Sequence, residues 1–567
     1  MFVKLTKSGP RRYVQLAESY RDADGKVRQR TIASLGRLEA LGEQLDSIVR
    51  GLHRVTGREL PDLGEEPAPQ IDFSPSLALG DCWVLDSLWR ELGFDRLGAV
   101  LNTGRRRYPP EALLRVMVFN RLCDPQSKLG ILRWLERVWL PGIDPAIVTH
   151  QRLLRTMDAL VDSQSAIDGI VASLLRPLID VELSVVFYDL TSVSTEGLSV
   201  QDGEVRHYGR SKEGGIKRQF VLGVVQTAEG LPVHHEVFDG NVAEVSTLKT
   251  SLDKVMAKFP IRRVIAVADR GLMSSDNLAQ LQTIKTPSGE PLEYILAVPG
   301  RRYGEFAKLL APLQKKHFAE ADEECIAETR WNGLRLVVAH DPHKAAELTA
   351  RRDATIKALE DQAADWSTKL DDQDAGRKKR GRPLSDGGAR AKFYHQVLEE
   401  RLGSIIKVDL KSQLFSYGID RDARRLAELN DGKLLLVSNV DAKDLDAEQI
   451  VARYKALSDI ERGFRVLKSE IEIGRFFHRL PHRIKAHAQI CFIALILHRV
   501  MRMRLRESGA TSSPERALEQ LRQIQFHSVS LNGVRHTGVS TLSAENRALL
   551  RGLGATNPPS AEQLSLL

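Results

Sequence analysis

Two short apolar runs in the middle of the chain each end at an aspartate. The run at 185–188 (Val-Val-Phe-Tyr) precedes Asp189, and the run at 264–268 (Val-Ile-Ala-Val-Ala) precedes Asp269. Short apolar runs rich in β-branched and aromatic residues predict buried strands. We therefore expect each aspartate at the end of a strand.

The pattern around these runs predicts a sheet with a definite strand order. Further strands are expected at 220–225, 232–238 and 294–298, with helices at 246–258 and from Ser274. Three strands, a helix, a strand, a helix and a strand form a meander followed by crossovers. That order matches a ribonuclease-H-like α/β sheet, in which the first and fourth strands are neighbours. Asp189 and Asp269 are then expected side by side.

A long amphipathic segment at 454–468 predicts a helix that carries a third carboxylate, Glu461. Tyr454, Glu461 and Lys468 are seven residues apart, or two helical turns, and so share one face. Arg465 follows Glu461 by about one turn. An adjacent apolar stripe is expected to pack on the sheet; it contains Ile460, Phe464, Leu467 and Ile471.

Two strand-end aspartates and a helical glutamate suit a hard divalent cation. Carboxylate oxygens are preferred ligands of Mg²⁺ and Mn²⁺, and the remaining coordination positions go to water and phosphate. The flanking cations suit phosphate. Taken alone, the helix fits a solvated face that carries i,i+4 ion pairs better than a metal site. The two aspartates that follow strands in the expected order reverse that preference.

The rest of the chain predicts additional modules around this sheet. Residues 1–40 suggest an antiparallel β module, and residues 77–178 suggest helices with a basic cluster at 105–107. The interval 461 − 269 = 192 is longer than a compact sheet needs, so a large insertion is expected before Glu461. The predicted division is 1–76 (β module, helix and linker), 77–180 (helical DNA-binding domain), 181–300 (first segment of the catalytic core), 301–440 (inserted subdomain with a charged helical hairpin), 441–510 (second segment of the catalytic core) and 511–567 (C-terminal tail).

The composition shows a modest excess of basic residues and indicates in which cellular compartment the protein is expected. The 567 residues carry 82 Lys and Arg against 74 Asp and Glu, with a net charge of +8 and a pI near 9.2, which favours nucleic acid as a partner. The four cysteines include no C-x-x-C pair, and the N-terminus has no signal-peptide core. A reducing, cytoplasmic location at the nucleoid is expected. The apolar stretch 488–497 is too short for a membrane span and predicts a buried helix.

Several blocks resemble one family. Tyr-Asp-Leu-Thr-Ser at 188–192, Ala-Asp-Arg-Gly at 268–271 and Tyr454-x6-Glu461-x6-Lys468 resemble the DDE transposases of bacterial insertion sequences. The branch is the one whose third block reads Tyr-x2-Arg-x3-Glu-x6-Lys. Gly-Asn-Val-Ala-Glu at 240–244 also resembles it. Leu457 stands where that block has arginine, and Arg465 or Arg462 is the candidate substitute.

The resemblance implies a two-metal phosphoryl transfer on DNA. It makes Asp189, Asp269 and Glu461 the ligands of Mg²⁺ or Mn²⁺, with Tyr454 and Lys468 on DNA phosphate. Arg465, the better placed of the two substitutes for the missing arginine, is expected on DNA phosphate as well. The implied partners are double-stranded DNA, both the terminal inverted repeats and the target, and a second copy of the chain at the DNA ends. The alternatives are a stand-alone metal-dependent nuclease and a catalytically inactive, transposase-derived DNA-binding repressor.

Three further motifs support weaker interpretations. The basic segment 377–383, Arg-Lys-Lys-Arg-Gly-Arg-Pro, resembles an AT-hook or is simply a solvated tip. His478, His482 and His487 lie close together around Pro481, but zinc is disfavoured, and a DNA-facing turn at 475–479 is preferred. The polar segment 207–212 is expected either to touch substrate or to be a surface loop.

Overall fold

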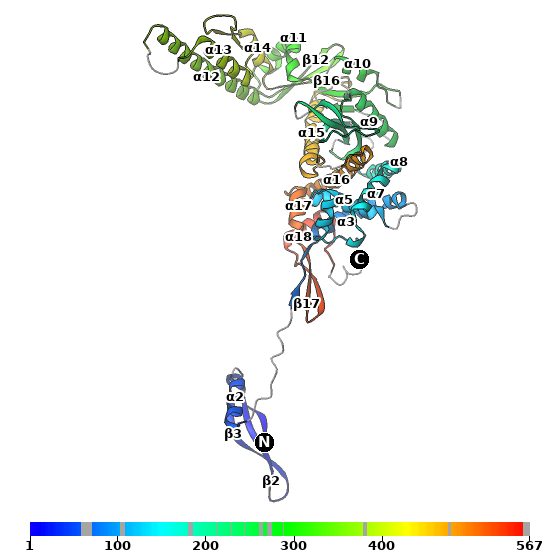
Figure 1. Cartoon of the computed structure of the whole chain (residues 1–567), viewed down its shortest axis with the longest axis vertical. Coiled ribbons are helices and arrows are strands. Elements are labelled where there is room, and N and C mark those ends of the chain that lie inside the picture. Colours follow the sequence, from blue (N-terminus) through cyan, green and yellow to red (C-terminus); the bar gives the residue numbers. More distant parts are fainter. Residues whose placement is uncertain are drawn as a thin grey trace. The chain divides into compact units, whose positions relative to one another are not determined.

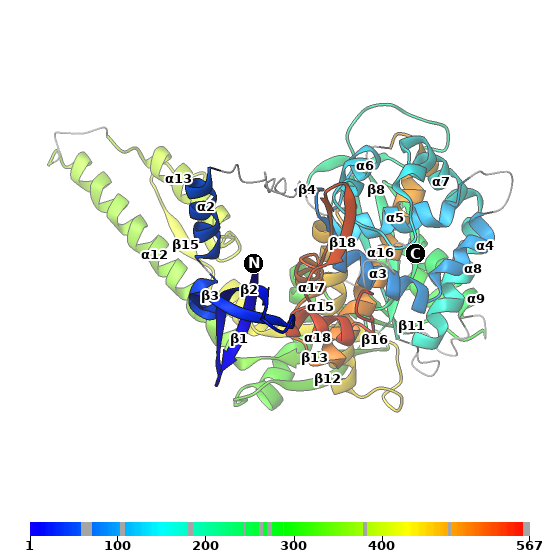
Figure 2. The ribbon, with the colours of Figure 1, turned by 90° about the horizontal axis from the view of Figure 1, so that it is seen from below.

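The computed structural model describes residues 1–42, 44–57, 71–102, 108–179, 185–211, 214–227, 229–242, 244–259, 265–268, 275–286, 289–377, 383–474 and 478–559. The basic cluster predicted at 105–107 lies outside these residues. The chain forms two compact units. Unit 1 comprises Met1–Ser74 and Val529–His536, and unit 2 comprises Pro75–Ser528 and Thr537–Leu567. Figures 1 and 2 show the ribbon from two directions.

Unit 1 is built on the predicted antiparallel β module. The strands β1 (Phe2–Ser8), β2 (Arg11–Arg21) and β3 (Val27–Arg37) pair in that order, and α1 (Leu38–Leu41) and α2 (Leu45–Thr56) follow. Asp22 Oδ1 accepts the backbone N–H groups of Asp24 and Lys26 and so stabilises the turn between β2 and β3. Within the predicted linker, β4 (Ile71–Phe73) pairs with Val529–Leu531. A short strand therefore replaces part of the linker.

The N-terminal region of unit 2 is helical, as the sequence predicts. Its elements are β5 (Leu77–Ala78), α3 (Gly80–Glu91), η1 (Phe94–Leu97), α4 (Gly98–Leu101), α5 (Pro110–Cys123), α6 (Lys128–Leu135), η2 (Pro145–Ile147), α7 (His150–Asp162), α8 (Gln164–Leu175) and η3 (Arg176–Leu178). α5 has Pro110 in its first turn, where a missing N–H costs little.

Nine strands of the described residues form one sheet. Their order is β12-β13-β16-β11-β10-β6-β8-β7, and β9 also pairs with β8. The bounds in the first half of the sheet are β6 (Val185–Ser194), β7 (His207–Arg210), β8 (Ile216–Thr227), β9 (Pro232–Asp239), β10 (Ile265–Ala268) and β11 (Glu293–Ala297), with helices α9 (Glu244–Lys258) and α10 (Ser275–Thr283). The predicted adjacency of the first strand and the strand before Asp269 is confirmed, because β10 runs parallel to β6.

The segment between β11 and the glutamate helix continues the same sheet. It contains η5 (Gly300–Phe306), α11 (Ala307–Leu313), η6 (Gln314–Phe318), β12 (Cys325–Trp331), β13 (Leu334–His340), α12 (Pro342–Asp374), α13 (Asp386–Glu399), β14 (Ile406–Val408), β15 (Tyr417–Ile419), α14 (Arg421–Asn430) and β16 (Lys433–Ser438). β13 and β16 each contain a short apolar run. α12 and α13 form a hairpin (Figure 2). This hairpin has its own apolar core around Phe393.

The segment from Ala447 onward is largely helical. It contains α15 (Ala447–Arg465), η7 (Val466–Glu470), α16 (Pro481–Glu507), α17 (Pro514–Leu521), β17 (Gln525–Leu531), β18 (Val534–Val539) and α18 (Ala544–Gly552). The sequence predicts a tail at 511–567. Instead Leu518, Leu521 and Leu550 are buried in the main core of unit 2, because α17 packs on α3 and α16 and α18 packs on α16 and α17.

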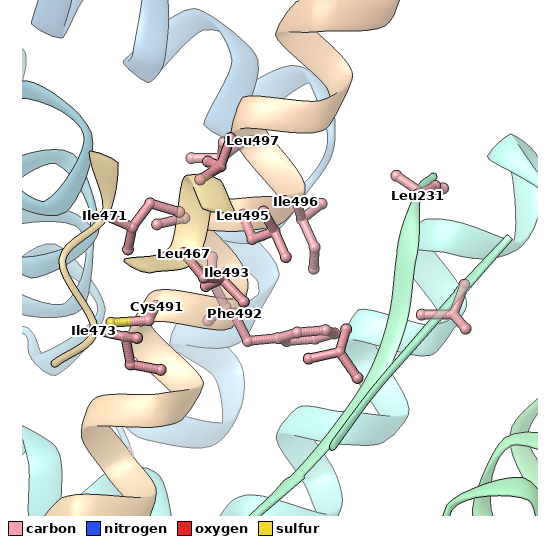
Figure 3. Close-up of a cluster of buried hydrophobic side chains, with 14 of the residues drawn as sticks. Leu231, Leu467, Ile471, Ile473, Cys491, Phe492, Ile493, Leu495, Ile496 and Leu497 are labelled. Atoms are coloured by element: carbon pink, nitrogen blue, oxygen red, sulfur yellow. The ribbon is translucent and has the colours of Figure 1, made fainter. Parts of the chain in front are cut away.

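The helix α16 lies at the centre of this core, and the buried helix predicted at 488–497 is confirmed within it. Figure 3 shows Leu467 and Ile471, which follow the glutamate helix, gathered against Leu495 and Leu497 of α16. On its other side, Phe492 stacks on His235 of β9 with ring centroids 4.3 Å apart. By length and composition α16 is apolar enough to cross a membrane, but 94% of its most apolar window is buried in the protein. It is a core helix.

Gly240 closes the β7–β8–β9 corner by a backbone-to-backbone approach. Its N–H donates to Val205 O and its carbonyl accepts from Gln219 Nε2, both at 3.0 Å. A Cβ at position 240 would overlap the carbonyl oxygen of Gln219 and lie 2.6 Å from that of His207. The polar segment from His207 forms the strand β7 at this corner instead of a loop.

Gly240→Ala is therefore expected to lower the free energy of unfolding by about 1–3 kcal/mol, the range for overpacking. Neither obstructing atom is the end of a flexible side chain, so the backbone has to move. Chemical denaturation measures the change. Gly418→Ala is the control, because a Cβ there meets no atom within 4 Å. Equal midpoints for Gly240→Ala and wild type would show that the corner tolerates a side chain.

Candidate active site

Asp189 lies within β6 and not at its end. The strand continues to Ser194, and Asp189 pairs with Val224 of β8. The prediction of a strand end was wrong because Thr191 and Ser192 are polar, yet both are buried in this continuation. On the β10 side the pairing described ends one residue earlier, at Tyr188 opposite Ala268. Asp189 is thus the residue of β6 that follows the last described pair between β6 and its parallel neighbour β10.

Asp269 lies outside the described residues, as do Arg270 and Gly271. The residue before it, Ala268, is the last of β10 and pairs with Tyr188, the residue before Asp189. The two apolar runs that the sequence predicts as strands therefore lie side by side and in parallel.

Glu461 is inside α15, the helix predicted for it. α15 covers one face of the sheet, where Ile450 and Val451 are buried against Ile265, Val267 and Ile295. Tyr454 is half-buried against the same cluster. The side chains at 457–464, which include Glu461, Leu457 and Arg462, lie outside the described residues of the helix.

The helix changes its geometry just after Glu461. α15 ends at Arg465, and residues Val466–Glu470 form a π-helical turn, in which hydrogen bonds span one residue more. The seven-residue spacing from Glu461 to Lys468 predicts two α-helical turns on one face. The π turn changes the direction of Lys468 relative to that prediction. Arg465 precedes the turn and keeps the α-helical relation to Glu461.

Arg465 is exposed and borders a cavity of about 390 Å³. Other basic residues that line it are His498, Arg502 and Arg506 of α16. The cavity also contains Glu515, whose pKa burial alone would raise. Hydrogen bonds from His498, at 2.6 Å, and Ser513 outweigh burial and lower the pKa of Glu515 to about 2.

A buried ion network fixes the loop after β6. Glu204 binds Arg206 through both oxygens, at 2.7 and 2.6 Å, and Arg218 of β8 at 3.2 Å. All three side chains are at most 6% exposed. Arg206 also donates to the carbonyl of Arg479 at 3.0 Å. No local pattern in the sequence predicts this network, since its partners come from three separate segments.

The histidine group does not assemble into a metal site in the described residues. His487 Nε2 donates to Ile473 O at 3.1 Å, and His482 pairs with Asp158 at 3.3 Å. Among the residues that the structure describes, the one compact set of possible ligands is Asp81, Cys82 and Cys123. Arg522 already neutralises Asp81 at 2.8 Å, and burial raises the pKa of the Cys82 thiol. A hydrogen bond with Cys82 lowers the pKa of the Cys123 thiol, but burial and the nearby Asp81 outweigh it, so that pKa is raised as well. This set is a core ion pair beside protonated thiols.

The basic segment 377–383 lies mostly outside the described residues, as does 475–477 of the predicted DNA-facing turn. Arg377, the first residue of the basic segment, pairs with Asp372 at the end of α12 at 2.9 Å, and both are exposed. The AT-hook interpretation stays a prediction.

Comparison with protein families matches two regions. Residues 181–497 match the Transposase DDE domain, and residues 3–67 match the IS1634 family transposase, N-terminal domain. The first match holds the sheet, α15 and most of α16, and it defines an enzyme class that cuts and transfers DNA and generally uses divalent metal ions. No curated protein matches the chain.

Because the DDE match spans more than half of its length, the chain belongs to the DDE transposases, and with its N-terminal match it is a transposase of an insertion sequence. The α/β sheet is consistent with a ribonuclease-H-like core.

Proposed function

We propose that the protein cuts DNA at the ends of its own insertion sequence and transfers the 3′-hydroxyl strand to target DNA by two-metal phosphoryl transfer. Asp189, Asp269 and Glu461 would hold Mg²⁺ or Mn²⁺. A bound metal would activate the attacking hydroxyl and stabilise the leaving oxygen. The terminal inverted repeats and the target would both be double-stranded DNA, bound by two copies of the chain.

The observation that carries this proposal is the register of β6 and β10. Ala268 of β10 pairs with Tyr188 of β6, and the two strands run parallel. In the sequence, Asp189 comes directly after Tyr188 and Asp269 directly after Ala268. Consecutive Cα atoms are about 3.8 Å apart, which is why we place Asp269 in the neighbourhood of Asp189.

Strand alternation supports placing both positions on the face that α15 covers. Tyr188 and Leu190 are buried in the main core, on the opposite face from Ile265 and Val267, which pack with α15. Successive residues of a strand alternate between faces, so position 189 shares the face of Val267. Glu461 comes from the helix on that face. Three carboxylates brought to one place are a donor set that fits a hard divalent cation.

Tyr454, Lys468 and Arg465 are proposed to bind DNA phosphate beside the metals. Residues 301–440 are proposed as an insertion into the catalytic core that extends its sheet. A nuclease on the same sheet would not need the N-terminal unit or this segment. A repressor would not need the three carboxylates that are proposed here as metal ligands.

A strand-transfer assay tests the proposal. Purified protein, Mg²⁺ and DNA that carries the element's own ends should give nicks at the element's 3′ ends and, with target DNA, joined products. Nicks without joined products would identify a nuclease. Binding to the ends without nicks, in Mg²⁺ and in Mn²⁺, would identify a repressor.

At position 457 the chain has leucine where the family block has arginine. Whether Arg465 takes over the role of that arginine can be tested. Arg465→Ala should weaken binding to element ends by about 1–3 kcal/mol, the range for a charge-assisted hydrogen bond. Titration of labelled end DNA at fixed salt measures it. Arg453→Ala, about three turns earlier on α15, is the matched control and should change binding less. Equal affinity for Arg465→Ala and wild type would refute the substitution.

A further inference from the structure

A second basic site lies among the helices of unit 2, apart from the carboxylates. A cavity of about 510 Å³ is lined by α5, α6, α7, α16 and the segment 478–480. Its basic and histidine lining includes Arg121, Lys128, His150, His478, Arg483 and His487. None of the described residues that line it is acidic. The volume lies in the range of pockets that hold small ligands, roughly 300–1,000 Å³.

Lys128 is the most unusual group in this cavity. It is the first residue of α6, and its side chain is only 5% exposed. Within the described residues its ammonium has no hydrogen-bond or ion-pair partner. Burial and the nearby Arg121 together lower the pKa of Lys128 to about 7. A buried ammonium without an anion is a costly arrangement that a bound anion would relieve.

Arg121 adds a second buried cation on the same wall. It is 1% exposed, and it donates to the carbonyl oxygens of Ile471, at 3.4 Å, and Gln126. These bonds hold the guanidinium at the cavity. Its positive charge lies close enough to Lys128 to disfavour the charged ammonium, and an anion between them would be attracted by both groups.

Among the residues that the structure describes, the other groups that line the cavity do not supply a negative charge that would balance Lys128. Arg483 is itself a cation and is already paired with Asp158, at 2.8 and 3.0 Å. Burial and the neighbouring cations lower the pKa of His478 to about 3 and hold that of His487 well below its ordinary value, so both imidazoles are neutral at physiological pH. An anionic ligand is therefore the partner that this lining favours.

The N-terminus of α6 points to the same kind of ligand. Ser127 caps the helix, and its hydroxyl accepts the N–H of Gly130 at 3.0 Å. The N–H groups at the start of a helix carry partial positive charge and favour anions. One cavity is therefore bordered by the start of α6, the buried ammonium of Lys128 and the buried guanidinium of Arg121.

We propose that this cavity binds a phosphate group, and that the phosphate belongs to the DNA backbone. The choice of DNA rests on the proposed function, whereas the choice of phosphate rests on the cavity alone. A buried contact of this kind fixes the position of the DNA on the protein without reading its sequence. A free phosphate or nucleotide shares the chemistry, and the experiment separates the two sources.

Lys128→Met tests the proposal, because it removes the charge and keeps most of the side chain's volume. With DNA of the element ends, the slope of log K against log salt should become shallower by about 0.9, the value for one phosphate contact. Lys128→Arg should restore most of the affinity. Lys485→Met is the matched control, since Lys485 is an exposed residue of α16 that does not line the cavity.

Thermal unfolding supplies a readout that needs neither DNA nor cleavage. Inorganic phosphate at rising concentration should raise the melting temperature of wild type and of Lys485→Met, but not that of Lys128→Met. Without phosphate, Lys128→Met should melt no lower than wild type, because it loses an uncompensated buried charge. A lower melting temperature would show that the ammonium has a structural role and would overturn the proposal.

The combined outcomes separate the possibilities. If phosphate stabilises wild type through Lys128 but the DNA salt slope is unchanged in Lys128→Met, the ligand is a free phosphate or nucleotide and the DNA assignment is overturned. If neither readout depends on Lys128, the cavity is not a phosphate site. A protein that fails to cut DNA and still shows both effects would contradict the proposed function and leave this site standing.

Discussion

Asp189→Asn, Asp269→Asn and Glu461→Gln are each expected to abolish cleavage at the element ends while leaving DNA binding largely intact. The amide keeps the shape of the carboxylate but lacks the charge that a divalent cation requires. Loss of a metal removes several kcal/mol of transition-state stabilisation, which corresponds to more than about a thousandfold in rate. Single-turnover nicking in Mg²⁺ measures the effect.

Two neighbouring carboxylates provide controls for these variants. Glu448→Gln alters the first turn of α15, and Asp239→Asn alters the exposed end of β9; both should cut at the wild-type rate. Band-shift titration without metal checks that the inactive variants still bind. Any variant of the three that cuts as fast as wild type would remove its residue from the metal site.

Glu204→Gln is expected to lower the free energy of unfolding by about 3–5 kcal/mol, the cost of breaking a buried ion pair by removing one partner. The change leaves Arg206 and Arg218 buried with a neutral neighbour in place of a carboxylate. Urea denaturation at neutral pH measures it. Glu196→Gln, on the same loop but exposed, should change stability by less than about 0.5 kcal/mol.

The difference in stability between wild type and Glu204→Gln should also depend on pH, and the direction of that dependence can be predicted. Burial alone would raise the pKa of Glu204, but hydrogen bonds from Arg206 outweigh it and lower the pKa from 4.5 to about 2. A carboxylate with a lowered pKa stabilises the fold fully above its unfolded pKa and loses that contribution as pH falls toward the folded value. The stability difference between wild type and Glu204→Gln should therefore shrink between about pH 4.5 and pH 2. A difference that stays constant over this window would contradict the ionic role.

The sequence predicts the centre of the sheet well because a short, continuous apolar run is a local signal. The runs before Asp189 and Asp269 form parallel neighbours, and the amphipathic segment around Glu461 forms one helix. Where polar residues are buried, the same signal fails. It ends β6 at Asp189, although Thr191 and Ser192 lie inside the strand, and it does not predict β7 as a strand.

Features that depend on contacts between distant segments leave no local pattern in the sequence. The π turn after Arg465 interrupts a periodicity that the prediction takes as uniform. The short helices α17 and α18 carry few apolar residues, and only packing on α3 and α16 shows that they belong to the core. The burial of Lys128 needs four helices to meet, so its sequence context resembles that of any exposed lysine.

The chain leaves the sheet at the end of β13, forms the hairpin of α12 and α13, and returns to the sheet at the start of β16, next to the point where it left. β13 and β16 are antiparallel neighbours, with His340 opposite Lys433, and Asp341 N–H donates to Gly432 O at 2.9 Å. The segment between these residues has its own apolar core, whereas β13 and β16 complete the sheet beside β11. The chain could therefore gain, lose or lengthen this arm at a narrow joint with the catalytic sheet unchanged. Its reach is free to vary in evolution independently of the chemistry.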